Sequence, residues 1–357
     1  MEKKIVRRLQ KVRERFAPEG IDGLIVSKPE NQAYLTGFAS DDLTVVITGG
    51  QQYILTDCRY TETVADHCPD FTLVEIVQGT GLPEFLEKLD LPVTGFESAV
   101  MSVADHSKLA SRLGADRLRG VTGLVEKARL IKDEEEIGAI TRAAALGDQC
   151  FSHMLTVFRE GITEKEAALE LEWFLRTNGA ERLSFDTICI FGSHTSLPHG
   201  VPGERRLTAG DLITMDFGCV VDGYCSDMTR TVAFGRVTEE QKKIYDIVLA
   251  AQRAGVEGIR AGMTCREADA LCRDVIAAAG YGEYFGHGTG HGVGLEIHEA
   301  PTLNPRTETV LEENMTVTIE PGIYFPKKFG IRIEDLAIVT SSGIINKVSS
   351  EKELIVL

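Results

Sequence analysis

The segment "DLITMDFGCVVDGYCSDMTRTVAF" (residues 211–234) contains two apolar runs rich in β-branched residues. The dipeptide Asp222-Gly223 separates them. Asp-Gly between two such runs is a strong sequence signal for a two-residue hairpin turn. The segment therefore predicts an antiparallel β-hairpin, and the position of its turn predicts which residues face one another.

This hairpin puts two aspartates on one face. Its register places Asp216 opposite Thr229, with Asp227 two residues before Thr229 in the same strand. Because side chains alternate between the two faces of a strand, Asp216 and Asp227 then lie on the same face, with Cβ atoms about 7–8 Å apart or less. Two acids on an otherwise apolar hairpin are costly unless water or cations reach them. The hairpin alone leaves both explanations open.

A second candidate hairpin carries another acidic pair. "MTVTIEPGIYFPKKFGIRIEDLAIV" (residues 315–339) is expected to form two strands around a turn centred on Lys328. Glu320 and Glu334 are then on one face. Pro321-Gly322 is expected to disturb the ladder, because proline has no N–H to donate.

The two hairpins follow two copies of an internal repeat. "FREGITEKEAALEL" from Phe158 aligns with "IRAGMTCREADALC" from Ile259 at a spacing of 101 residues. In each copy a threonine is expected to cap the start of a helix. The acidic pairs repeat at the similar spacings of 104 and 107 residues. A pseudo-twofold relation between the halves would bring four carboxylates together, and two divalent cations would neutralise them.

A glycine-rich segment supplies candidate nitrogen ligands. "FGHGTGHGVGLEIHE" (residues 285–299) holds three histidines among five glycines. So many glycines exclude a zinc-binding helix of the HExxH type and favour extended backbone that passes close to another segment. A carboxylate-rich dinuclear centre commonly needs one imidazole. The spacing does not decide which of the three histidines provides it.

Composition limits the class of protein. A chain of 357 residues with 43% hydrophobic and 26% charged residues suggests a globular protein of two domains. Its net charge of −16 argues against nucleic acid or an anionic membrane as a main partner. The charged start "MEKKIVRRLQKVRERF" does not resemble a signal peptide, and no apolar run approaches the roughly 20 residues of a membrane span. We expect a cytoplasmic protein with cysteine thiols, including Cys219 and Cys225.

The first third of the chain reads as alternating helix and strand. We expect a helix over residues 5–16, a strand from Gly23 and a hairpin around Gly49-Gly50. No dense cluster of candidate ligands occurs there. The predicted domains are an N-terminal α/β domain, residues 1–125, and a C-terminal domain, residues 126–357.

Five motifs in order resemble those of the pita-bread metallopeptidases, which include methionine aminopeptidase, aminopeptidase P and prolidase. They are "MDFG", "CSDMTRT", "GHGTGHGVGLEIHE", "IEPGIY" and "RIED". "LSFDTICIFGSHTSLPHG" (residues 183–200) and "GLIVSKPENQAYLTGF" resemble the branch that cleaves Xaa-Pro bonds. The resemblance implies an α+β fold: a creatinase-like N-terminal α/β domain, then a pita-bread domain with a pseudo-twofold repeat. It also implies a homodimer.

The resemblance implies roles for ten residues. The metal-ligand positions are Asp216, Asp227, His291, Glu320 and Glu334. Substrate and transition-state histidines match His199, His287 and His298, while Arg332 matches a residue that orients substrate or ligands and Phe185 matches the lining of the proline pocket.

The implied activity is that of a metallo-exopeptidase acting on small peptides with proline in second place. Two divalent metal ions, Mn or Co in first place and Zn or Fe as alternatives, would bridge a hydroxide. Glu320 would take a proton from the attacking water, and His199 or His298 would stabilise the oxyanion. His287 and Phe185 would shape the slot for the proline ring. Neither nucleic acid nor a membrane is an expected partner.

Three alternatives stay open at this level. A methionine-aminopeptidase-like or other hydrolase could use the same fold. A non-catalytic binding protein is a further alternative, which the complete set of ligand positions disfavours. Within the Xaa-Pro branch, the sequence does not separate a dipeptidase from an aminopeptidase P, and it selects neither the metal nor the first residue of the substrate.

Overall fold

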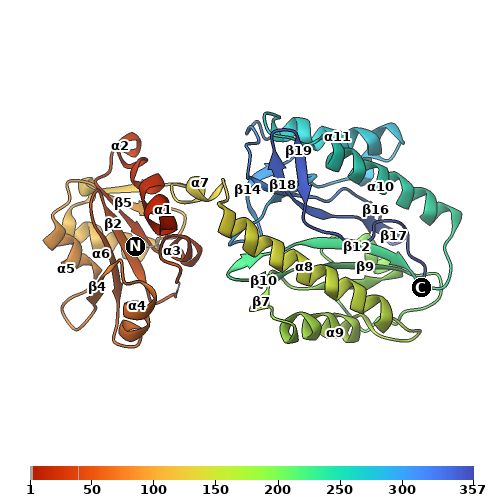
Figure 1. Ribbon diagram of the computed structural model, residues 1–357, viewed down its shortest axis with the longest axis horizontal. Helices are drawn as coiled ribbons and strands as arrows, with labels where there is room; N and C mark the ends of the chain where they lie inside the picture. Colours follow the sequence, from red (N-terminus) through yellow and green to blue (C-terminus); the bar gives the residue numbers. More distant parts are fainter. Residues whose placement is uncertain (1–2, 39) are drawn as a thin grey trace. The chain divides into compact units, whose positions relative to one another are not determined.

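The computed structural model describes residues 3–38 and 40–357. Contacts divide the chain into two compact units, Met1–Arg129 and Leu130–Leu357 (Figure 1). The division falls a few residues beyond the predicted boundary, and the limits 1–125 and 126–357 stay a prediction. Within the described ranges, no helix is both long enough and apolar enough to span a membrane.

The N-terminal unit is built on a mixed sheet of six strands in the order β4-β3-β2-β1-β5-β6. The strands are β1 (Gly23–Val26), β2 (Thr44–Thr48), β3 (Gln52–Thr56), β4 (Thr72–Glu75), β5 (Thr94–Glu97) and β6 (Leu118–Val121). β2 pairs antiparallel with β1 and β3, whereas β4, β5 and β6 join in parallel. The predicted strand from Gly23 and the hairpin around Gly49-Gly50 are confirmed.

Helices connect these strands and complete an α/β unit. They are α1 (Lys3–Arg13), α2 (Phe16–Glu19), α3 (Pro29–Thr36), α4 (Thr61–His67), α5 (Leu82–Leu89), α6 (Val103–Leu113), η1 (Ala115–Arg117) and α7 (Glu126–Arg129). The helix predicted over residues 5–16 is shorter at its end, because α1 stops at Arg13 and α2 starts at Phe16. A buried cluster including Ile25, Leu55 and Phe96 forms part of the core.

The C-terminal unit repeats one order of elements. Its first half contains α8 (Glu134–Val157), α9 (Glu164–Thr177), β7 (Arg182–Leu183), β8 (Ile188–Phe191), η2 (Gly192–Ser196), β9 (Leu212–Phe217), β10 (Cys219–Val221), β11 (Tyr224–Cys225) and β12 (Met228–Ala233). Its second half contains α10 (Glu239–Gly258), α11 (Cys265–Ala278), η3 (Gly282–Tyr284), β13 (Gly290–Gly292), β14 (Glu299–Leu303), β15 (Thr316–Ile319), β16 (Gly322–Phe325), β17 (Phe329–Arg332), β18 (Asp335–Thr340) and β19 (Gly343–Asn346).

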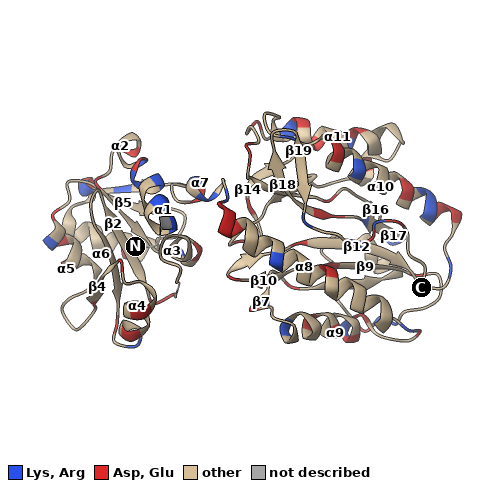
Figure 2. Cartoon of the chain, in the orientation of Figure 1, with Lys and Arg blue, Asp and Glu red and all other residues tan. Residues whose placement is uncertain are grey.

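The repeat is visible at the helix starts. Thr163 caps α9 and Thr264 caps α11, each in a capping box with the glutamate three residues later. The long helices that precede them, α8 and α10, start with acidic residues, which suit the positive end of the helix dipole (Figure 2). The predicted α+β organisation with an internal repeat is therefore confirmed.

The first hairpin has the predicted register. Asp216 pairs with Thr229 across β9 and β12. At its turn, Asp222 and Gly223 both adopt positive φ, 50° and 79°, as a tight two-residue hairpin turn requires. Asp216 and Asp227 therefore lie on the same face, as the sequence predicts.

The second hairpin differs by one position from the prediction. Phe325 pairs with Phe329, so the turn is centred on Lys327 and not on Lys328. Lys327 accommodates the tighter geometry with a positive φ of 63°. The ladder is interrupted between β15 and β16, where Pro321 was expected to disturb it. Both strand pairs share one register, which places Glu320 opposite Glu334.

Apolar residues of α10 and α11 form the core of the second half with the strands β15 to β18. Val248 and Ile276 come from the helices, and Val317, Ile331 and Val339 come from the strands. All are almost fully buried, so these strands have little freedom to move. All eight cysteines are free thiols, Cys219 and Cys225 included, which confirms that prediction.

Candidate active site

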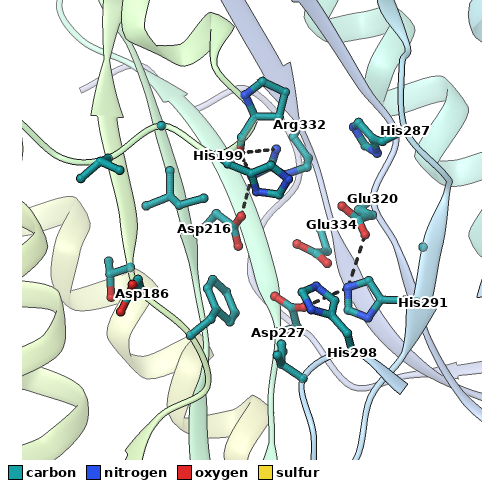
Figure 3. A pocket seen from close by; sticks show the side chains of 18 of the residues that line it. Asp186, His199, Asp216, Asp227, His287, His291, His298, Glu320, Arg332 and Glu334 are labelled. Atoms are coloured by element: carbon teal, nitrogen blue, oxygen red, sulfur yellow. Dashed lines mark hydrogen bonds and ion pairs between the residues drawn. The ribbon is translucent and has the colours of Figure 1, made fainter. Parts of the chain in front are cut away.

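A cavity of about 1150 Å³ opens within the C-terminal unit (Figure 3). All ten residues selected from the sequence line it. They are Phe185, His199, Asp216, Asp227, His287, His291, His298, Glu320, Arg332 and Glu334. Residues from both halves of the unit, separated by more than 100 positions in the sequence, thus share one cavity.

The four carboxylates come from equivalent places in the two hairpins. Asp216 lies on β9, and Asp227 lies in the short connection before β12. Glu320 directly follows β15, and Glu334 lies between β17 and β18. In Figure 3 these side chains converge from facing strands. The alternation of each hairpin thus aims an acidic pair at the same space.

His291 is the imidazole that joins this cluster. Its Nδ1 lies 3.0 Å from Gly292 O, so the proton is on Nδ1, which donates to the carbonyl. Its Nε2 then carries a lone pair and lies 3.5 Å from both Asp227 Oδ2 and Glu320 Oε1. This hydrogen bond fixes the tautomer that can bind a cation through Nε2.

Glycine allows the histidine strand to approach its neighbours closely. A Cβ on Gly290 would lie 1.9 Å from Thr318 O, and one on Gly292 would lie 2.3 Å from Ala300 O. Any side chain at either position would displace the backbone that carries His291. The prediction that these glycines mark close backbone approach is confirmed at both positions.

The donor atoms of the cluster suit a divalent cation. Asp227, His291 and Glu334 each offer one ligand atom, and these atoms lie within 4.8 Å of one another. Glu334 Oε2 accepts a hydrogen bond of 2.6 Å from the Thr229 hydroxyl. Glu334 Oε1 is buried without a hydrogen-bond partner within the described structure. A bare buried carboxylate oxygen is costly, and a cation would satisfy it.

The electrostatics of the cluster favour the same interpretation. Burial and the neighbouring carboxylates raise the pKa values of Asp227 and Glu334 well above the ordinary range. Burial raises the pKa of Asp216, and it raises the pKa of Glu320 to about 8. Burial lowers the pKa of His291 to about 4, which keeps the ring neutral. Crowded carboxylates beside a neutral imidazole suit a positively charged ligand.

The guanidinium of Arg332 is hydrogen-bonded to other side chains of the site. Its NH2 lies 2.5 Å from Asp216 Oδ2, and its NH1 donates to Tyr324 OH at 2.7 Å. Its Nε donates to the Thr229 hydroxyl at 3.0 Å. Arg332 is only 4% exposed. The guanidinium therefore orients a candidate ligand, Asp216, and shows little surface to solvent.

His287 has both ring nitrogens engaged. Nδ1 donates to Gly288 O at 2.8 Å, and Nε2 accepts from Tyr324 OH at 3.0 Å. Burial lowers the pKa of His287 to about 4, so the ring is neutral. Tyr324 was not selected from the sequence. Its position diagonally across the hairpin from Arg332 is the signal that could have identified it.

His199 and His298 differ from the other two histidines. Both are exposed and line the cavity. Within the described residues, neither ring has a hydrogen bond to another protein group, although His298 packs edge-on against His291 at 4.5 Å between ring centroids. Their nitrogens are thus available to a bound molecule. Half-buried Phe185 lines the same cavity with Leu169 of α9, which no motif identified.

Two family models match this chain. The model described as metallopeptidase family M24 matches residues 138–341. The model described as creatinase/prolidase N-terminal domain matches residues 8–131. Together they cover both units, and they confirm the predicted creatinase-like and pita-bread domains.

Known proteins resemble the chain over its whole length. An uncharacterized peptidase of Bacillus subtilis is 43% identical over 98% of this chain and 100% of the relative. The structure of a Xaa-Pro dipeptidase from Bacillus anthracis is similar with a TM-score of 0.95 and 43% identity, covering 99% and 100% of the two chains. That of an X-Pro aminopeptidase from Thermotoga maritima has a TM-score of 0.90 and 34% identity, covering 97% and 99%.

Proposed function

Because this chain belongs to metallopeptidase family M24, we propose that it hydrolyses the Xaa-Pro bond at the N-terminus of dipeptides or short peptides. One observation carries the proposal. The bare Nε2 of His291 faces Asp227 and Glu320, at 3.5 Å from each, in a cavity where two exposed histidines remain free. The similarity to a Xaa-Pro dipeptidase and an X-Pro aminopeptidase supports the choice of bond.

We propose that the cluster holds two divalent cations. The ligands would be Asp216, Asp227, His291, Glu320 and Glu334. When bound, such cations supply Lewis acidity, which polarises the scissile carbonyl and makes water nucleophilic near neutral pH. Mixed oxygen and imidazole ligation suits Mn or Co, with Zn or Fe as alternatives. Calorimetric titration of each metal would rank them.

Glu320 is the proposed acceptor of the proton from the attacking water. Its carboxylate lies beside His291 and is 18% exposed at the side chain, so water can reach it. Burial raises its pKa to about 8 in the absence of a cation. A bound cation would displace this proton and leave the carboxylate form, which can accept a proton from water.

His298 or His199 is proposed to stabilise the oxyanion that forms as the carbonyl is attacked. Their exposed rings line the cavity, and a donor aimed at the developing negative charge lowers the barrier. A bond before proline has no N–H, so a peptidase for it must bind the substrate without that donor. Phe185 and the neutral face of His287 are the proposed walls for the proline ring.

The structure suggests how a dipeptide carboxylate would be bound. Arg332 is occupied by Asp216 and Tyr324, so it has little capacity for a substrate anion. His199 lies on the cavity wall near Arg332 and is exposed, and we propose it as the partner of that carboxylate, which leaves the oxyanion to His298 (Figure 3). Comparing turnover of Ala-Pro with Ala-Pro-Ala would show whether a free carboxylate directly after proline is required.

The decisive experiment removes and restores the metal. We expect the chelated protein to lose cleavage of Ala-Pro and to regain it with Mn²⁺, while Ala-Ala and Met-Ala-Ser are poor substrates. Asp227→Asn should abolish cleavage. Asp222→Asn is a matched control at the turn of the same hairpin, where asparagine suits the positive φ. Cleavage that survives exhaustive chelation, or Asp227→Asn, would contradict the proposal.

The quaternary state and location are also proposals. We propose a homodimer, as the family resemblance implies, and a cytoplasmic location. Sedimentation of the metal-loaded protein would test the dimer, and fractionation of cells would test the location.

A further inference from the structure

The glycine-rich segment of the site is held by an ion pair on α11. Arg273 Nε lies 2.6 Å from Asp269 Oδ2, and its NH2 lies 2.9 Å from Asp269 Oδ1. Asp269 is 1% exposed, and the two residues are one helical turn apart. Such a two-point pair fixes the plane of the guanidinium as well as its charge.

Arg273 extends this pair to the backbone beside His287. Its NH1 donates to Phe285 O at 3.1 Å, and its NH2 donates to His287 O at 2.7 Å. Its guanidinium also lies 4.3 Å from the centre of the buried Phe285 ring. The glycines of this segment provide no side-chain packing of their own. The guanidinium therefore replaces that packing with directed hydrogen bonds.

Asp269 holds the same segment two residues further along, at Thr289. Its Oδ1 accepts from the backbone N–H and the hydroxyl of Thr289, both at 2.9 Å. Thr289 is completely buried, and its carbonyl accepts the backbone N–H of Glu320 at 2.7 Å. A continuous chain of hydrogen bonds thus runs from α11 through Thr289 to Glu320. His291 follows Thr289 by two residues in the glycine-rich segment.

We infer that Asp269 and Arg273 are positioning residues, which set the geometry of His287, His291 and Glu320 through the backbone of the glycine-rich segment. This inference rests on the proposed function for its activity measurement. Neither residue lines the cavity, so they act through the groups that do. Partners that hold ligand groups in this way commonly change metal affinity or activity by about 10–100-fold when they are lost.

The internal repeat supports a specific role for this pair. At the spacing of 101 residues, Asp269 corresponds to Ala168 and Arg273 to Glu172 on α9. The first half therefore lacks the pair, although it keeps the threonine-capped helix. The ion pair occurs in the half that carries the glycine-rich segment, which indicates that it serves that segment and not the common scaffold.

The test compares Asp269→Asn, Arg273→Gln and the double variant with the wild type. Mn²⁺ affinity is measured by calorimetry, and kcat/KM is measured with Ala-Pro as substrate. Both measurements use a temperature at which circular dichroism shows each protein fully folded. We expect each single variant to lose about 10–100-fold in both quantities. The double variant should lose no more than the worse single one, because the two residues act as a unit. Arg142→Gln, which removes an exposed ion pair with Asp222, is the matched control and should change neither.

Arg273→Lys keeps the charge and much of the side-chain volume. It replaces Arg273→Gln in the test if that variant does not fold. It should recover part of the loss, since an ammonium can reach only some of the four acceptor atoms. Folded Asp269 and Arg273 variants that keep Mn²⁺ affinity and kcat/KM within about twofold of the wild type would overturn the inference. If the wild type does not cleave Ala-Pro, the proposed function fails, and Mn²⁺ affinity alone decides the inference.

Discussion

The two halves of the C-terminal unit share a scaffold but not their functional groups. Residues 130–235 and 236–357 each contain a long helix, a threonine-capped helix and a hairpin that contributes two carboxylates to the cavity. The strand next to the hairpin differs. β8 is buried and carries no charged side chain, whereas β13 carries His291. Duplication of the hairpin accounts for the four carboxylates. Divergence between the halves accounts for the imidazole of His291, which only the second half contributes to the cluster.

The halves also hold their histidine-bearing loops in different ways. In the first half, buried Glu164 at the start of α9 accepts the backbone N–H groups of Phe191 and Gly203, both at 2.8 Å. These residues flank the loop that carries His199. In the second half, Asp269 and Arg273 bind the glycine-rich segment from further along α11. Each half thus uses a buried carboxylate on the capped helix, but at a non-equivalent position.

The largest expected effect comes from removing one carboxylate from each half. Asp227→Asn and Glu334→Gln should each lower kcat/KM by about 10³-fold or more, since both acids are proposed metal ligands and neither half can substitute for the other. Metal content per chain and cleavage of Ala-Pro measure the effect. Glu308→Gln, on an exposed glutamate, is the control. A variant of one half that keeps near-normal activity would show that the halves do not contribute equally.

Arg332 tests the asymmetry of the halves. The equivalent position in the first half, 107 residues earlier, is Cys225, so the repeat provides no arginine that could replace Arg332. Arg332→Lys should lower kcat/KM by about 10–100-fold, because an ammonium cannot bond Asp216, Tyr324 and Thr229 in their present geometry. Steady-state kinetics should show the loss in kcat, with Arg142→Lys as an exposed control. A loss confined to KM would instead indicate that Arg332 binds the substrate directly.

Local sequence rules reached the symmetric part of the site, whereas the histidines and Arg332 of the asymmetric part were identified only by the family resemblance. The Asp-Gly turn and strand alternation predict the register that faces Asp216 with Thr229, because both are local rules. The second turn was displaced by one residue, since "PKKF" has no glycine to mark its positive φ at Lys327. Spacing alone did not select His291 among the histidines, whereas the family resemblance did; the hydrogen bond to Gly292 O, which orients the ring, is visible only in the structure. Tyr324 was not identified from the sequence, because its role depends on tertiary contacts.

The acidic cluster predicts opposite pH responses for the metal-free and metal-loaded protein. The pKa values of Asp227 and Glu334 lie above those of an unfolded chain, and that of Glu320 rises to about 8. As the pH rises, the unfolded chain loses these protons first and is favoured, so the metal-free protein should lose stability between about pH 5 and pH 8. We expect its melting temperature to fall by roughly 5–10 °C over this interval.

Bound Mn²⁺ should reverse the sign. Cations compete with protons for the carboxylates, so the loaded protein should become more stable as the pH rises through the same interval. Differential scanning calorimetry of both forms measures the two slopes. Asp227→Asn should flatten the slope of the metal-free protein, because it removes one of the groups with a raised pKa. Equal slopes with and without Mn²⁺ would contradict the assignment of these acids as ligands.

The smallest expected effect tests whether the common scaffold is equally important in the two halves. The hydroxyl of Thr163 accepts the Glu166 N–H at 3.1 Å, and that of Thr264 accepts the Glu267 N–H at 3.2 Å. Thr163→Ala and Thr264→Ala should each lower the free energy of unfolding by about 1 kcal/mol, without changing kcat/KM of the folded protein. Serine at either position keeps the hydroxyl and should restore most of the loss. A much larger effect of Thr163→Ala, in denaturant unfolding followed by circular dichroism, would mean that the first helix also stabilises the loop of His199 through Glu164.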